Sequence, residues 1–153
     1  MRPLFLAAAL AFTAPLATLA DEADMIRVKS ASDVPATVEK LVTAAEAAGA
    51  TVFARVDHGA GAQKVGKDIG PSVAVIFGNP AAGTPVMEQN RLAGAILPLQ
   101  VLVYQDADGT VWLAHEDLGD RLDDLDGIDD TDEAVTKLEA ALDNLVNAAA
   151  QPG

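Results

Sequence analysis

Strand-like segments in a fixed order constrain the fold of this chain more than any other feature. Residues 51–57, 71–77, 99–105 and 110–114 are short and rich in apolar and β-branched residues. The run 73–77 is apolar throughout, which predicts burial on both faces. Residues 106–109 end in the Asp-Gly pair typical of a β-hairpin, so we expect the last two segments to pair in antiparallel fashion. Residues 25–29 alternate apolar and polar side chains and predict a further strand.

Two longer segments carry a helical pattern. From residue 34 to residue 48 apolar side chains recur at helical spacing, with Ser32 as the expected N-cap and Gly49 as the expected end. A second helix follows Thr131, its expected N-cap, and has an apolar stripe along its length. Strands joined by a hairpin and flanked by amphipathic helices predict a single compact α+β domain. Its sheet is expected to be mostly antiparallel, with helices packed on one face.

The N-terminus has the pattern of a secretory signal peptide. Arg2 gives a positive start, residues 4–19 are mostly apolar, and Thr18-Leu19-Ala20 offers small residues at a cleavage site. A membrane-spanning helix is the weaker alternative, because the stretch is short, contains a proline and is followed by acids. We therefore expect a signal peptide over 1–20 and a mature domain over 21–153. The mature chain is expected to be periplasmic or secreted, without stable insertion in a membrane.

Composition excludes several classes of function. The chain has 10 Lys and Arg against 23 Asp and Glu, a formal charge of −13, which argues against binding nucleic acid. Cysteine is absent, so disulfides, thiolate metal sites and cysteine nucleophiles are excluded. Neither a Gly-x-Ser-x-Gly nor a His-Glu-x-x-His motif occurs. No catalytic residue is therefore assigned, and the chain is not expected to be an enzyme.

Several blocks of sequence are similar to one known family. They are Phe-Ala-Arg-Val-Asp-His at 53–58, Ile-Phe-Gly-Asn-Pro-Ala-Ala-Gly-Thr-Pro-Val-Met at 76–87, Leu-Pro-Leu at 97–99 with Val-Leu-Val-Tyr at 101–104, and Asp-Gly-Thr-Val-Trp-Leu at 108–113. In this order and spacing the chain resembles the bacterial DUF302 family over nearly all of its mature length. The resemblance implies a compact α+β domain that is often a homodimer and has no established enzymatic activity. The chain departs from the family where it carries His115-Glu116-Asp117, since many members have a Tyr followed by Asn there.

The pair Asp57-His58 is the first candidate ligand-binding site. It ends a predicted strand and precedes a glycine-rich stretch, and a histidine in such a place can act as a base, a metal ligand or a haem ligand. The alternative is a structural histidine that ties the loop to the sheet. Met87 is a candidate second ligand for haem, since His/Met ligation is a known pairing, or else a buried packing residue.

Residues 78–84 have two glycines five positions apart after a strand, as a phosphate-binding loop does. No lysine follows, so the pattern indicates a strand exit and turn at Asn79-Pro80 instead. Thr84 is then the expected N-cap of a short helix with Pro85 at its first position. Asn79 and Thr84 are candidate ligand-binding residues, because a helix N-terminus can hold an anion or a carboxylate.

His115 and Glu116 are candidate metal ligands together with His58. Two histidines and a carboxylate suit a divalent transition metal, provided that the two strands are neighbours in the sheet. A polar strand end that faces solvent is the alternative. The acidic stretch 106–133, with twelve acids and one base, raises calcium binding, but its spacing does not fit an EF-hand and a solvated loop is favoured.

The preferred hypothesis is an exported, non-enzymatic module that binds a small ligand, with haem or a divalent metal as candidate cofactors. One alternative is a small hydrolase or isomerase that uses Asp57 and His58 as a base pair. Another is a structural homodimer that contacts its partner through a sheet edge or the apolar segment 92–99.

Overall fold

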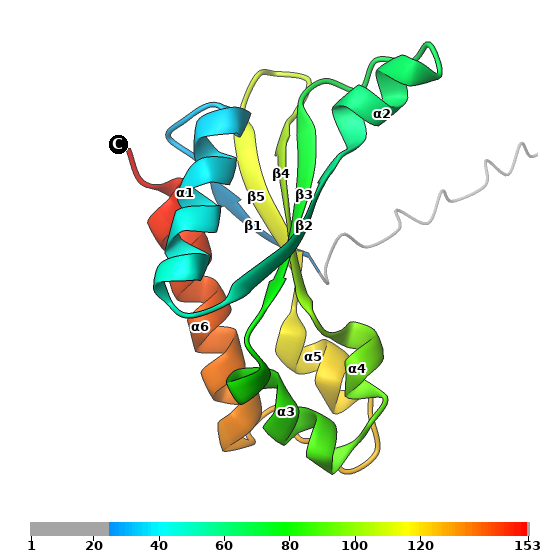
Figure 1. The fold of residues 1–153 in the computed structure, drawn as a ribbon, viewed down its shortest axis with the longest axis vertical. Helices are drawn as coiled ribbons and strands as arrows, with labels where there is room; N and C mark the ends of the chain where they lie inside the picture. The colour runs from blue at the N-terminus through cyan, green and yellow to red at the C-terminus, as the bar shows by residue number, and fades with distance from the viewer. Residues whose placement is uncertain (1–24, 153) are drawn as a thin grey trace, which may run out of the picture.

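The computed structural model describes residues 25–152, so the predicted signal peptide over 1–20 lies outside the described residues. Within them, five strands form one antiparallel sheet in the order β1-β5-β4-β3-β2 (Figure 1). Their bounds are β1 (Met25–Lys29), β2 (Thr51–Asp57), β3 (Ser72–Gly78), β4 (Leu99–Gln105) and β5 (Val111–Glu116). Each strand lies within two residues of a predicted segment, and β4 and β5 form the predicted hairpin. The predicted α+β class is confirmed.

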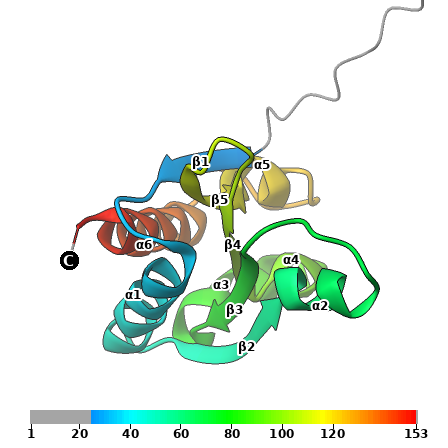
Figure 2. The same cartoon turned by 90° about the horizontal axis from the view of Figure 1, so that it is seen from above.

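One face of the sheet is covered by two helices. α1 (Val34–Ala47) and α6 (Glu133–Ala150) lie side by side on it (Figure 2). Because side chains alternate along a strand, every second residue of β3, β4 and β5 points toward these helices. The core that results contains fully buried side chains from both layers: Leu41, Val75, Phe77, Val101, Val103, Leu113, Val135 and Val146.

The N-caps of both long helices differ from the predicted ones. Asp33, not Ser32, caps α1, and its carboxylate accepts a hydrogen bond from the Ala36 amide at 2.9 Å. α6 begins after Asp132, one residue later than the predicted cap Thr131. In both helices an Asp directly follows the predicted Ser or Thr, and Asp is at least as good an N-cap. The residue types alone therefore do not decide which of the two neighbouring residues caps the helix.

Four shorter helices lie at the two ends of the sheet in the described part of the chain (Figure 1). α2 (His58–Lys64) stands at one end, and α3 (Pro80–Gln89), α4 (Ala93–Ile96) and α5 (Leu118–Asp123) lie at the other. α2 and α4 project on the side of the sheet that α1 and α6 leave uncovered (Figure 2). Among residues 25–152, none of the helices has the length and apolar character needed to cross a bilayer.

The start of α3 corrects one prediction. The helix begins at Pro80, and Asn79 is its N-cap, with the side-chain oxygen accepting a hydrogen bond from the Ala81 amide at 2.9 Å. Thr84 therefore lies inside the helix and is not its N-cap. Proline is well tolerated at the first position of a helix, so Asn79-Pro80 ends the strand and starts the helix at once.

Candidate binding site

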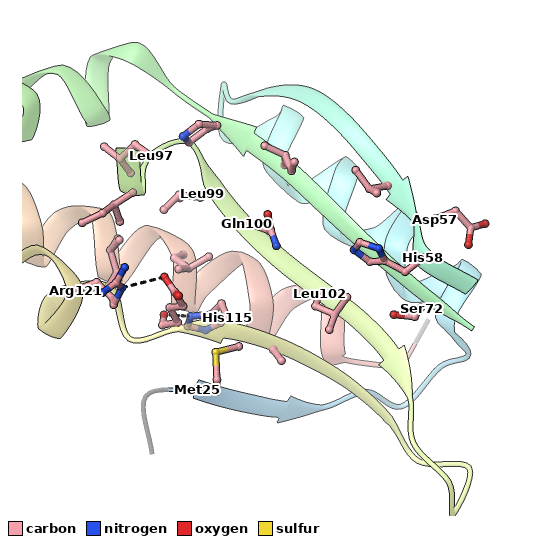
Figure 3. Close-up of a pocket in the computed structure, with 18 of the residues that line it drawn as sticks. Met25, Asp57, His58, Ser72, Leu97, Leu99, Gln100, Leu102, His115 and Arg121 are labelled. Atoms are coloured by element: carbon pink, nitrogen blue, oxygen red, sulfur yellow. Dashed lines mark hydrogen bonds and ion pairs between the residues drawn. The ribbon is translucent and has the colours of Figure 1, made fainter. Parts of the chain in front are cut away.

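The uncovered face of the sheet forms a groove with a volume of about 1070 Å³ (Figure 3). A row of residues paired across three strands, Ala74, Leu102 and Ala114, runs along this face, and Leu102 and Ala114 of this row line the groove. The two alanines are buried and short, so the floor is low along this row. α2 stands at one end of the groove, and the α4–β4 connection and α5 close the other. The arrangement makes a trough rather than a flat sheet surface.

The groove gathers apolar side chains that water reaches. Met25 and Val56 are about two fifths exposed, at 41% and 40%. At the α2 end, Val65 is 74% exposed and Ile69 is 55% exposed. Exposed apolar side chains gathered in one groove, unlike single exposed leucines, are a feature that binding sites share.

His58 and Asp57 lie at the α2 end of this groove and have different surroundings. Asp57 is the N-cap of α2, and its carboxylate accepts a hydrogen bond from the Ala60 amide at 2.7 Å. His58 is the first residue of α2, is exposed and lines the groove, and the two side chains point in different directions (Figure 3). Among the described residues no hydrogen bond joins them, so Asp57 does not orient the imidazole as the partner of a catalytic base does.

His115 also lines the groove, at the end opposite to His58, and its Nε2 faces α6. It is 3% exposed, its Nδ1 lies 2.9 Å from the Glu116 carbonyl oxygen, and its Nε2 lies 4.0 Å from an Asp143 carboxylate oxygen on α6. Nε2 is buried and has no hydrogen-bond partner. Glu116 is exposed, and its carboxylate accepts a hydrogen bond from the Arg121 guanidinium at 3.3 Å. Both residues thus serve the junction of β5 with α5 and α6.

The structure does not bring the predicted metal ligands together. Asp57 pairs with Val73, Val73 with Val103, and Val103 with Leu113. β2 and β5 are therefore three strand spacings apart, about 14 Å, which separates His58 from His115 and Glu116. Within residues 25–152 no three His, Cys, Asp or Glu side chains are placed to hold a metal ion.

A second, smaller cavity of about 450 Å³ lies between the end of the sheet, α3 and α4. Asn79 and Met87, both predicted ligand-binding residues, line it, together with Phe53 from β2. Thr84 is exposed and lines neither this cavity nor the groove. His58 lines the groove and Met87 the smaller cavity, so the structure does not pair them as ligands on opposite sides of one haem.

Sequence reasoning missed the polar groups on the open face. Arg27 stacks over the rings of Trp112 and Tyr104, at 4.5 and 5.6 Å from their centroids. Asp106 accepts a hydrogen bond from the Trp112 indole at 2.8 Å and lies 3.9 Å from the Arg27 guanidinium. Gln100, in β4, is exposed within the groove. Side chains alternate between the two faces of a strand, so knowing which face is covered would have placed these residues on the open face.

The acidic stretch packs against the domain through its apolar side chains. Leu118, Leu122 and Ile128 from this stretch are buried in the core. Hydrogen bonds from Thr131 lower the pKa of Asp129. The aspartates of residues 120–130 are exposed, as expected for a solvated loop.

Comparison with known proteins identifies the family. Residues 26–147 match the model of the family described as Domain of unknown function DUF302. The chain belongs to the DUF302 family. A crystal structure of an uncharacterized conserved DUF302 protein from Bacillus stearothermophilus has the same fold, with a TM-score of 0.73. The two structures align over 84% of this chain and 99% of the Bacillus chain, with 21% sequence identity. At this level of identity the likeness shows the fold alone.

Curated relatives carry a different name. The chain is 40% identical over 103 residues to the Fluoride-specific ion channel FluC 1 of Brucella suis biovar 1, a match over 67% of this chain and 40% of the relative. The Fluoride-specific ion channel FluC 2 of Brucella melitensis biotype 1 matches at the same identity over 38% of its length. The chain thus spans about two fifths of the length of the curated relatives that it matches.

Proposed function

We propose that this DUF302 protein is a non-enzymatic binding module that holds a small amphipathic molecule in the open-face groove. The observation that carries the proposal is the apolar surface left exposed on the sheet, with Val56, Met25 and Val65 at 40%, 41% and 74% exposure. A soluble domain gains nothing from such a surface unless something covers it.

The shape and polarity of the groove define what fits. Ile76 and Leu102 are half-buried and offer contact to the apolar body of a ligand, above the low alanine row. His58 at one end and Gln100 along the floor offer hydrogen bonds to its polar groups. Small-molecule sites combine these features, and their volumes run from about 300 to 1,000 Å³, so the groove suits a large ligand.

Haem is one member of this class. Its ring system is flat and apolar, and the exposed imidazole of His58 could ligate the iron from the end of the groove. A bare divalent metal is less well supported, because the residues around His58 do not supply further ligands in the described part of the chain. In this proposal metal binding is therefore assigned to the haem iron rather than to a bare ion.

The base-pair alternative has less support. A hydrolase or isomerase that used Asp57 and His58 would need the carboxylate to hold the imidazole, whereas Asp57 caps α2. The channel activity in the names of the Brucella relatives is not part of the proposal, because this chain spans only about two fifths of those proteins.

A homodimer is the second candidate, and a specific observation favours it. Val65 and Ile69 protrude at the α2 end with 74% and 55% exposure, so a second copy could cover the same face. We further propose that the mature chain, residues 21–153, acts in the periplasm or outside the cell, as its N-terminal pattern indicates.

Native mass spectrometry tests the proposal directly. The chain would be isolated from the periplasm without a tag or chelator, beside a Leu102→Asp variant and a Thr84→Ala control that lies outside both cavities. We expect a non-covalent adduct on the wild type and the control that is lost from Leu102→Asp, because the charge opposes apolar binding. Added hemin should show a Soret band shifted from that of free hemin, and His58→Ala should remove the shift. A clean apo dimer that neither gains an adduct nor binds hemin would overturn the proposal in favour of the homodimer.

A further inference from the structure

We infer that the smaller cavity binds a hydrocarbon chain carried by the amphipathic molecule that lies in the groove. The ligand class is therefore an amphipath with an unbranched alkyl chain. The inference rests on the proposed function and adds a second site to it.

The lining of the smaller cavity is almost entirely apolar. Phe53, Met87 and Leu97 contribute to its walls, and Leu138 of α6 lies among its lining residues. The one polar side chain, Asn79, uses its oxygen to cap α3. A polar ligand group would therefore lose its hydrogen bonds to water on entry and find few replacements, whereas a hydrocarbon would lose none. The volume of 450 Å³ lies within the range of about 300–1,000 Å³ for small-molecule sites.

Two helical glycines leave this space open. A Cβ at Gly83 would lie 3.3 Å from a terminal methyl of Leu97, and one at Gly94 would lie 3.4 Å from the sulfur of Met87. Neither glycine has a positive φ, so the backbone does not require glycine at these positions. Glycine within a helix is unfavourable relative to alanine, so its presence at both positions is explained by the room that it leaves.

The two cavities adjoin at one segment. Leu97, Pro98 and Leu99 line both of them, and Figure 3 shows Leu97 and Leu99 at the α4 end of the groove. Phe53 lines the smaller cavity and is 58% exposed, so the cavity opens to solvent beside the sheet. In this proposal the shared segment is the route that a narrow, flexible alkyl chain takes from one space to the other. Met87 and Leu97 are side chains that adapt to such a chain.

A chain-length series tests the inference. Isothermal titration calorimetry would measure the binding of n-alkanoates with six to fourteen carbons to the mature protein. We expect the affinity to rise about fourfold with each methylene that enters the cavity and to level off when the cavity is full. Gly94→Leu should make the affinity level off at a shorter chain and leave the binding of hexanoate unchanged. Ala140→Leu, on the exposed side of α6, is the matched control and should follow the wild type.

A second variant keeps the test decisive if Gly94→Leu folds poorly. Met87→Ala enlarges the cavity, so the affinity should continue to rise with longer chains, a gain that unfolding cannot produce. If the affinity depends on chain length in the same way for the wild type, Gly94→Leu and Met87→Ala, the alkyl site is overturned while binding in the groove stands. If the wild type binds no alkanoate of any length, the alkyl site is overturned, and the groove is overturned with it only if the native-mass-spectrometry adduct and hemin binding are also absent.

Discussion

The two faces of the sheet differ although the same strands supply both. On the face under α1 and α6, Val75 and Phe77 are at most 1% exposed. On the open face, Ile76 is half-buried and Val56 is 40% exposed. Neighbouring residues in β3 thus belong to different environments, because side chains alternate. The comparison teaches that one face carries most of the core of the domain and leaves the other exposed, as the proposed binding site requires.

The size of the side chains follows the same division. Large residues fill the covered face, whereas Ala74 and Ala114 occupy the centre of the open one. Alanines there keep the floor of the groove low between α2 and α4. A sheet face whose only role was to contact solvent would be expected to carry polar residues at these positions.

Truncation of adjacent residues in β3 should give the largest difference between the faces. Phe77→Ala should destabilise the domain by about 3–5 kcal/mol, since it leaves a cavity in the core. Ile76→Ala should cost about 1 kcal/mol, because much of its side chain is already in water. Urea unfolding of the mature chain measures both. Equal losses would show that the open face is covered in the folded protein, as a homodimer requires.

Most of this fold was predictable from local patterns. The strands and the two long helices follow from periodicity, because each buries one face. α2 was missed: the His-Gly-Ala-Gly-Ala sequence at 58–62 has low helix propensity, and only the cap from Asp57 indicates a helix. The cap at Asn79 was missed because Asn-Pro is also typical of a turn.

The site was less predictable, since its residues meet through the register of the sheet. The strand end at Asp57-His58 was located correctly, but its distance from His115 depends on a strand order that no local pattern encodes. Nor did the sequence indicate that His115 faces α6. Leu102 and Ala114 of the groove floor are ordinary strand residues, and only knowledge of the covered face distinguishes them.

Removal of helix caps sharpens the comparison at a smaller scale. Asp33→Ala should lower the free energy of unfolding by about 1 kcal/mol, because α1 belongs to the covered face and unfolds with the core. Asp57→Ala removes the equivalent bond from α2, whose one buried residue is Gly59. It should raise amide hydrogen exchange within α2 and leave the melting temperature unchanged. Equal loss of global stability from the two variants would mean that α2 unfolds together with the sheet, against the division proposed here.

The smallest effect is expected from the charge of Glu139 on α6. Desolvation raises the pKa of this carboxyl, and the charges of Asp117, Asp143 and Asp130 raise it further, although a hydrogen bond from the Gly119 amide opposes them. The folded state therefore holds the proton more tightly than the unfolded state, and stability falls as the pH rises through the folded-state pKa. Glu139→Gln keeps an oxygen for Gly119 and removes the charge. It should match the wild type near pH 4 and exceed it at pH 7 by less than about 1 kcal/mol, since the hydrogen bond from Gly119 offsets part of the desolvation. Urea unfolding between pH 4 and pH 7 measures the difference. A variant less stable than the wild type at pH 7 would show that the charged hydrogen bond outweighs desolvation, so that the covered side depends on more than apolar packing.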